Sequence, residues 1–86
     1  MRIAGLQHDI TWEDPEATCA HVAPMIADAV AGGAELVLLT EMFATGFSLA
    51  ADRIAEPPGG PTEAFLANRA AECGAWVGGT IPTADP

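Results

Sequence analysis

Lysine and tyrosine are absent from this sequence of 86 residues, and Arg2, Arg53 and Arg69 are its only basic residues apart from histidine. Twelve acidic residues outnumber them and give a formal net charge of −9. Because nucleic acids and anionic bilayers are bound through lysine and arginine, the composition argues against both as partners. The excess of carboxylates indicates an acidic, solubilising surface.

Cysteine is also scarce, and its spacing argues against the common cysteine-based sites. Cys19 and Cys73 lie far apart and form neither a CxxC pair nor a metal-ligand pattern. The most apolar run, Leu36–Leu39, is much too short to span a membrane. The first apolar residues meet Gln7–Asp9 before they reach the length of a signal-peptide core. We therefore predict a reduced cytoplasmic protein that carries no metal and no cofactor.

Half of the residues are hydrophobic and 17% are charged, which is typical of a globular chain. Apolar periodicity and the positions of glycine and proline predict regular elements in alternation. These elements are a strand over 3–7, a helix that begins at Pro15 and stops at Gly32-Gly33, a strand over 35–40, a helix from Thr62 to Gly74, and a strand over 75–81. Pro24 lies inside the first helix and is expected to kink it.

Strands that alternate with helices predict a parallel sheet with right-handed crossover connections, which is an α/β fold. The strand over 35–40 has four consecutive apolar residues, and this favours burial on both of its faces. We also expect Trp12 and Trp76 to lie in the core. Residues 41–61 form a long connection rich in glycine and proline, and long ordered loops are often functional.

Ligands of open α/β sheets bind beyond the carboxyl ends of the strands. Three segments qualify here, namely Gln7–Asp9, Glu41 with the loop after it, and Ile81-Pro82. Glu41 is the sharpest candidate because a buried strand runs directly into it. His8 is a weaker candidate for a second acid–base group.

The neighbours of Glu41 suggest what it could do. Met42, Phe43 and Phe47 are apolar and would shield the carboxylate from water, which suits a general base that works near neutral pH. The alternative is a surface carboxylate that merely ends a strand.

The segment Leu38–Ser48 resembles the catalytic-glutamate segment of the nitrilase superfamily of carbon–nitrogen hydrolases, and more narrowly that of the ω-amidase-like bacterial branch. Thr40 stands where proline is usual in the family. Similar stretches cover the first strand, the starts of both helices and the third strand, in the expected order. The resemblance implies that residues 1–86 are the amino-terminal part of a single hydrolase domain. Their strand-helix-strand-helix-strand order would be the incomplete start of a four-layer α-β-β-α sandwich.

The resemblance also implies a mechanism. Family members hydrolyse small amides or nitriles through a cysteine thioester with a Glu, Lys and Cys set, and only Glu41 has a counterpart in this sequence. Cys19 and Cys73 fall in predicted helices and are interpreted as structural. Phe43 and Phe47 are candidate substrate-binding residues, and packing explains them equally well. The implied substrate is a small-molecule amide, with the ω-amide of a 2-oxo acid as first choice, and the implied complete assembly is a homo-oligomer.

A non-catalytic α/β binding module and an inactive truncated remnant are the alternatives. Flavodoxin-like and dinucleotide-binding folds also begin with strand, helix and strand. The turn after the first predicted strand, Gln7–Thr11, lacks the glycine-rich phosphate loop of such folds. A remnant would differ from the hydrolase only in the polypeptide beyond residue 86. We expect the fragment by itself to be inactive, because two of the three catalytic residues are missing.

Overall fold

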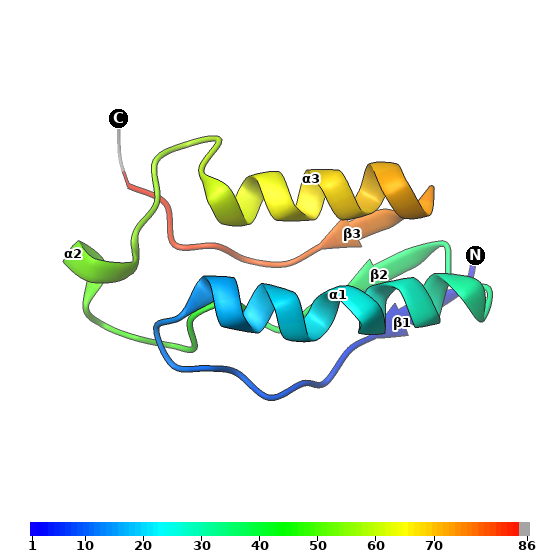
Figure 1. The fold of residues 1–86 in the computed structure, drawn as a ribbon, viewed down its shortest axis with the longest axis horizontal. Helices are drawn as coiled ribbons and strands as arrows, with labels where there is room; N and C mark the ends of the chain where they lie inside the picture. The colour runs from blue at the N-terminus through cyan, green and yellow to red at the C-terminus, as the bar shows by residue number, and fades with distance from the viewer. Residues whose placement is uncertain (85–86) are drawn as a thin grey trace.

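The computed structural model describes residues 1–84, and positions 85 and 86 of the predicted domain lie outside that range. A small sheet and helices alternate along the chain in the order β1 (Ile3–Gly5), α1 (Pro15–Ala31), β2 (Leu36–Leu38), α2 (Ala51–Ile54), α3 (Pro61–Cys73) and β3 (Trp76–Gly78). The strands lie side by side in the order β1-β2-β3 and pair in parallel. The predicted α/β alternation is confirmed, with shorter strands and the additional short helix α2 inside the long connection (Figure 1).

Helix α1 begins as its sequence predicts. The Asp14 carboxylate accepts a hydrogen bond from the backbone N–H of Ala17 at 3.1 Å, and Pro15 occupies the first helical position. The helix continues without interruption through Pro24, whose exposed side chain faces away from the core. Gly33, at a φ of 107°, leads the chain out of the helix and toward β2.

Helix α3 is capped by a side chain from the connection before it, six residues ahead of Thr62. The Glu56 carboxylate accepts hydrogen bonds from the backbone N–H of Thr62 at 2.8 Å and from its hydroxyl at 2.5 Å. Gly60 makes this approach possible, since a Cβ on residue 60 would lie 3.0 Å from Oε1 of Glu56 and 2.9 Å from the Pro57 carbonyl oxygen. The connection before α3 therefore folds back on itself and supplies the helix with its cap.

Helices α1 and α3 pack beside each other on the same face of the sheet (Figure 1). Two crossovers of the same hand between consecutive strands place both helices on one side. The middle residues of the three strands, Ala4, Val37 and Val77, lie in register and face the helices. The core that results is made of Val22, Ile26, Val37, Leu39, Phe43 and Ala44.

The opposite face of the sheet is open among the described residues. Ile3, Leu38 and Trp76 lie on it and are 60%, 44% and 72% exposed. The prediction that the second strand is buried on both faces is therefore wrong for this chain, because no element of residues 1–84 covers that side. The expected core placement of both tryptophans is also wrong, since Trp12 is 60% exposed.

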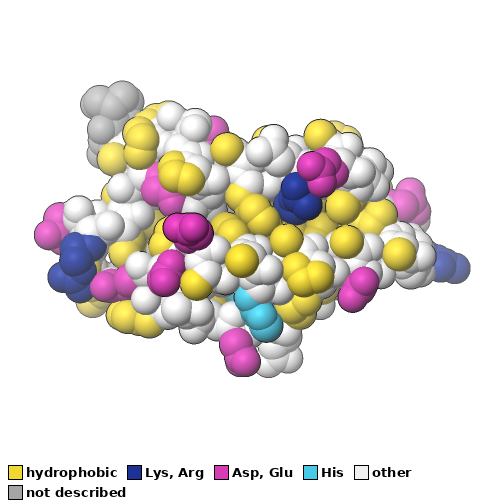
Figure 2. All heavy atoms as spheres, viewed as in Figure 1, with side chains coloured by type: hydrophobic (Ala, Val, Ile, Leu, Met, Phe, Trp, Pro, Cys, Tyr) yellow, Lys and Arg dark blue, Asp and Glu magenta, His cyan; other side chains and the backbone are white. Residues whose placement is uncertain are grey.

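The surface of the helix-bearing face carries few positive charges. Hydrophobic side chains gather along the furrow between α1 and α3, and acidic side chains are scattered around them (Figure 2). None of the helices within residues 1–84 is both long enough and apolar enough to cross a membrane.

Candidate active site

The carboxyl ends of the three strands meet at one edge of the sheet. Backbone pairing continues for one residue past the strands, because the N–H of Leu6 donates to the Leu38 carbonyl at 2.9 Å and the N–H of Leu39 donates to the Gly78 carbonyl at 2.8 Å. The segments that follow β1, β2 and β3 therefore leave the sheet at neighbouring positions. This is the arrangement that the parallel topology predicted for the candidate site.

Glu41 lies at this edge, two residues after Leu39 and directly before a sharp turn. Met42, the next residue, has a φ of 52°, a left-handed conformation that is unfavourable for a residue with a long side chain. Its backbone N–H donates a 2.7 Å hydrogen bond to the hydroxyl of Thr80, which follows β3. Strained backbone of this kind concentrates at functional sites. The turn leaves the Glu41 side chain exposed while the chain beyond it enters the core.

The expected apolar enclosure of Glu41 is not formed within this chain. Glu41 is exposed, Met42 is half-buried and Phe47 is 67% exposed. Only Phe43 is fully buried, and its ring packs into the core instead of over the carboxylate. The segment after Glu41 packs into the core on the side of the sheet where α1 and α3 lie. No part of residues 1–84 covers the Glu41 side chain, which is exposed.

His8 follows β1 and lies beside the residue that precedes Glu41. Its Nε2 is 3.4 Å from the hydroxyl of Thr40, and its Nδ1 is 3.0 Å from the carbonyl oxygen of Asp9. The imidazole and the Phe43 ring lie nearly perpendicular to each other, with 6.3 Å between ring centroids. The structure thus brings the ends of β1 and β2 together, as predicted. No hydrogen bond joins His8 to the Glu41 carboxylate among the described residues.

The two aromatic residues proposed to bind substrate have different environments. Phe43 has no exposed surface and stacks at a tilt on Phe65 of α3, with ring centroids 6.4 Å apart. Phe47 projects from the loop after Glu41 and is largely exposed. Phe43 therefore acts as a core residue in this chain, whereas Phe47 is available for contact with another molecule or with further polypeptide.

The cysteines lie on helices: Cys19 is in α1 and Cys73 is in α3. Burial raises the pKa of the Cys19 thiol to about 11, and the nearby Glu56 carboxylate contributes in the same direction. A thiol with so high a pKa is protonated at neutral pH and is a poor nucleophile. Cys73 is half-buried at the end of α3. Within residues 1–84, no cluster of three or more His, Cys, Asp or Glu side chains could hold a metal ion.

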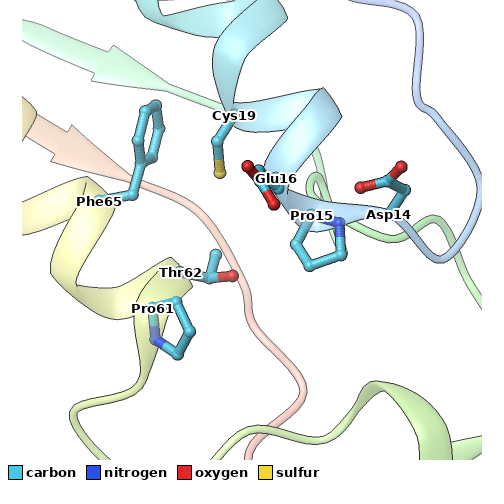
Figure 3. Close-up of a pocket in the computed structure, with 7 residues that line it drawn as sticks. All are labelled: Asp14, Pro15, Glu16, Cys19, Pro61, Thr62 and Phe65. Carbon is cyan, nitrogen blue, oxygen red and sulfur yellow. The ribbon is translucent and has the colours of Figure 1, made fainter.

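A cavity of about 530 Å³ lies between the first turns of α1 and α3. The Cys19 side chain points from α1 toward this cavity, and Phe65 faces it from α3 (Figure 3). Its lining is mainly apolar and consists of Asp14, Pro15, Glu16, Cys19, Pro61, Thr62 and Phe65. Because neither Glu41 nor either candidate aromatic residue lines it, this cavity is separate from the predicted chemistry.

Sequence reasoning missed two features of the edge that carries Glu41. The hydrogen bond from Met42 to Thr80 joins the segments that follow two different strands, and no local sequence pattern indicates it. The third strand was expected to reach the site at Ile81-Pro82, but β3 ends earlier, at Gly78, so that Thr80 makes the contact. The left-handed φ of Met42 carries no sequence signal either, since glycine or asparagine would be the usual residue there.

A family model of carbon–nitrogen hydrolases matches residues 2–85, nearly the whole chain. The chain belongs to the carbon–nitrogen hydrolase family. Among solved structures it is similar to XC1258 from Xanthomonas campestris, described as a CN-hydrolase superfamily protein with an arsenic adduct in its active site. The two share 34% sequence identity and superpose with a TM-score of 0.87. No curated protein matches the chain.

The match covers 98% of this chain but 31% of XC1258. The chain thus spans about a third of the length of that carbon–nitrogen hydrolase structure, and it corresponds to an N-terminal portion of the family fold. The resemblance to the nitrilase superfamily that the Leu38–Ser48 segment indicated is confirmed at the level of the family.

Proposed function

We propose that the complete protein hydrolyses the C–N bond of a small, non-peptide amide to a carboxylic acid and ammonia. Residues 1–86 would form the amino-terminal part of its single catalytic domain. Membership of the carbon–nitrogen hydrolase family supports the reaction class. The likeness of Leu38–Ser48 to the ω-amidase-like branch favours the ω-amide of a 2-oxo acid as substrate.

The observation that carries this proposal is the placement of Glu41. The carboxylate stands at the carboxyl edge of a parallel sheet, next to a residue in a strained conformation. Hydrogen bonds hold the backbone on both sides of it: Leu38 and Leu39 bond to the segments of β1 and β3, and Met42 bonds to Thr80. Such an edge is where α/β enzymes place their catalytic groups. Strand β2 precedes the carboxylate, and the turn at Met42 that follows it is held by Thr80. Together they give the carboxylate the fixed direction that a general base requires.

In the proposed reaction, Glu41 takes the proton from a cysteine thiol while the sulfur attacks the amide carbon. The C–N bond then breaks, the proton passes to the leaving nitrogen, and ammonia departs from a thioester. Water attacks the thioester with Glu41 as base, and the thiolate leaves and regains a proton. A lysine would stabilise the oxyanion at each addition step. The sequence has no lysine, and the high pKa of Cys19 argues against it as nucleophile, so both groups would come from polypeptide outside this chain.

We propose that exposed side chains near Glu41 contact the part of the active site that other polypeptide supplies. Phe47 lies on the same loop and is exposed, so it is the better of the two aromatic candidates for lining a substrate pocket. The exposed Glu41 would acquire its apolar enclosure when further polypeptide covers this edge.

The test is ammonia release by the complete protein from a panel of 2-oxo-acid ω-amides, aliphatic amides, N-carbamoyl amines and nitriles. Glu41→Gln should lower kcat by about 10²–10⁴-fold and leave the circular dichroism spectrum unchanged, because the side chain is exposed. Glu63→Gln, which changes an exposed carboxylate in the first turn of α3, is the matched control and should keep full activity.

Two outcomes would count against the proposal. Full activity in Glu41→Gln would remove Glu41 as the base. A wild-type protein that hydrolyses no member of the panel would overturn the reaction class and leave a non-catalytic module or an inactive remnant.

A further inference from the structure

The loop that carries Glu41 and Phe47 has little regular structure of its own. Between β2 and α3 it contains one short helix, α2 (Ala51–Ile54), an isolated bridge from Glu56 to Thr83, and otherwise turns and bends. A base on such a loop keeps its direction only if the loop is tied to rigid parts of the fold. The pairing of Glu56 with residues 82–84 ties the end of the loop, and the segment just before α1 ties its middle.

Glu13 is at the centre of the contacts. Its Oε2 accepts a hydrogen bond from the Ser48 hydroxyl at 2.5 Å and another from Nη2 of Arg53 at 3.0 Å, while its Oε1 accepts from Nε of Arg53 at 3.2 Å. The backbone N–H of Glu13 donates to the Thr45 carbonyl at 2.8 Å. We call Glu13, Ser48 and Arg53 the Glu13 latch.

Two properties distinguish the Glu13 latch from an ordinary surface ion pair, which contributes little to stability. The carboxylate is bidentate on the guanidinium and also satisfies a hydroxyl, so a single side chain holds two points of the loop. Its partner Ser48 is buried, and only 19% of the Glu13 side chain is exposed although the Arg53 side chain is 65% exposed. Hydrogen bonds from Arg53 and Ser48 also lower the pKa of the Glu13 carboxyl, which keeps it ionised around neutral pH.

Trp12 reinforces the same attachment. Its indole lies on Gly46 so closely that a Cβ on residue 46 would come within 2.6 Å of the ring. Gly46 has a φ of 80°, so glycine serves both the turn and the contact. Glu13 itself has a φ of 53°, an uncommon conformation for its residue type, which directs successive side chains of this segment at the loop.

The Glu13 latch is connected to the candidate base through the backbone. The Thr45 carbonyl accepts the hydrogen bond from the Glu13 N–H. The next residue, Gly46, donates its own N–H to the Met42 carbonyl at 2.9 Å. Met42 is the neighbour of Glu41, and its N–H is held by Thr80 on the other side. A displacement of residues 45–53 is therefore transmitted through these hydrogen bonds to the turn at Met42, which sets the direction of Glu41.

We infer that Glu13 is a positioning residue: with Ser48 and Arg53 it fixes the loop after β2, and through that loop it sets the direction of Glu41. The effect on catalysis rests on the proposed function, whereas the ordering of the loop does not. Glu13 itself makes no contact with substrate in this scheme.

The test combines hydrogen exchange and kinetics on the complete protein. In Glu13→Gln, amides of residues 44–54 should exchange at least about 10-fold faster, while those of α1 stay protected. Hydrolysis should lose about 10- to 100-fold in kcat, since displacement of a catalytic group by about 1 Å can cost 10²-fold. Arg53→Lys keeps the charge but not the bidentate geometry and should give an intermediate effect on both measurements.

Glu72→Gln is the matched control, because it breaks the Arg69–Glu72 ion pair of 2.9 Å on α3 and should change neither measurement. Ser48→Ala covers the case in which Glu13→Gln does not fold. It removes the bond from Ser48 to Glu13 and also the 3.1 Å bond from the Ala50 N–H to the Ser48 hydroxyl, so the Ala50 amide is left out of the comparison. The variant should raise exchange in the same residues by a smaller factor.

The outcomes separate the two proposals. Unchanged exchange of residues 44–54 in Glu13→Gln and Ser48→Ala would overturn the latch. Faster exchange with an unchanged kcat would overturn the positioning of Glu41. If the wild-type protein hydrolyses no amide, the proposed function and the positioning role fail together, and the exchange result still decides whether the latch orders the loop.

Discussion

The ring of Phe43 packs against the backbone of Gly79, so that a Cβ on residue 79 would stand 2.9 Å from Cδ1 and 3.2 Å from Cε1 of that ring. Phe43 has no exposed surface and ties the segment after Glu41 into the core beneath the sheet edge. Gly79 belongs to the segment after β3, so this contact joins two of the strand ends around the candidate site. Absence of a side chain at Gly79 is what allows the fit.

Gly79→Ala should therefore destabilise the protein by about 1–3 kcal/mol, because overpacking of a filled core forces side chains or backbone to shift. Urea denaturation followed by circular dichroism measures the change. Gly32→Ala is the control: Gly32 has an ordinary right-handed conformation, and an added Cβ meets its nearest neighbour at 3.4 Å. That variant should stay within about 0.5 kcal/mol of wild type. Equal stability of both variants would contradict the packing described here.

Phe43 and Phe47 should respond differently to truncation, since one is in the core and the other is on the surface. Phe43→Ala should cost about 3–5 kcal/mol of folding stability. Phe47→Ala should cost about 0.5 kcal/mol or less and should instead raise KM for the amide substrate. Denaturation and steady-state kinetics on both variants distinguish the roles. A large loss of stability in Phe47→Ala, with KM unchanged, would assign that residue to packing.

The left-handed backbone of Met42 predicts a specific pattern of tolerated residues. Met42→Val should lose about 1–3 kcal/mol, because a β-branched side chain fits poorly at a φ of 52°. The unbranched, similar-sized replacement Met42→Leu should cost less than about 1.5 kcal/mol. Thermal unfolding compares the two. If Val and Leu were equally tolerated, the strained turn next to Glu41 would not be a determinant of stability.

Cys19 should be slow to react with alkylating reagents. Its pKa of about 11, compared with an ordinary 9.0, makes its thiolate fraction at pH 8 about 100-fold lower than that of a free thiol. Iodoacetamide labelling between pH 7 and 11, followed by peptide mass spectrometry, should show the rate rising throughout this range without a plateau below pH 10. Cys19→Ser should keep its hydrolytic activity. Rapid labelling at pH 8 would instead indicate an activated thiol.

Local signals predicted the elements well where the responsible interaction is itself local. Asp14 and Pro15 lie next to the helix they start, and the glycines after α1 and α3 stop those helices. Strand β2 was recognisable from consecutive apolar residues, and Glu41 from its position directly after that run. The cap of α3 by Glu56 was not predicted, because it acts from outside the helix over six residues.

Predictions failed where they depended on what covers a surface. The run that forms β2 indicated burial on both faces, and Trp12 and Trp76 were assigned to a core. An apolar segment indicates that its surface is buried in the complete fold, but it does not indicate which chain segment covers that surface. In residues 1–84 both long helices lie on one face, so Leu38 and Trp76 stay exposed on the other.

By itself, the sequence determined the α/β alternation, the helix starts, and the position of Glu41 at the carboxyl end of a strand, because these depend on periodicity and neighbouring residues. Only the tertiary structure decided that both helices share one face, that Thr80 holds the turn at Met42, and that Glu13 binds Ser48 and Arg53. These contacts join residues 35 to 40 positions apart. Which distant groups meet depends on the order of the strands in the sheet and on the packing of the whole chain, and no local pattern encodes either.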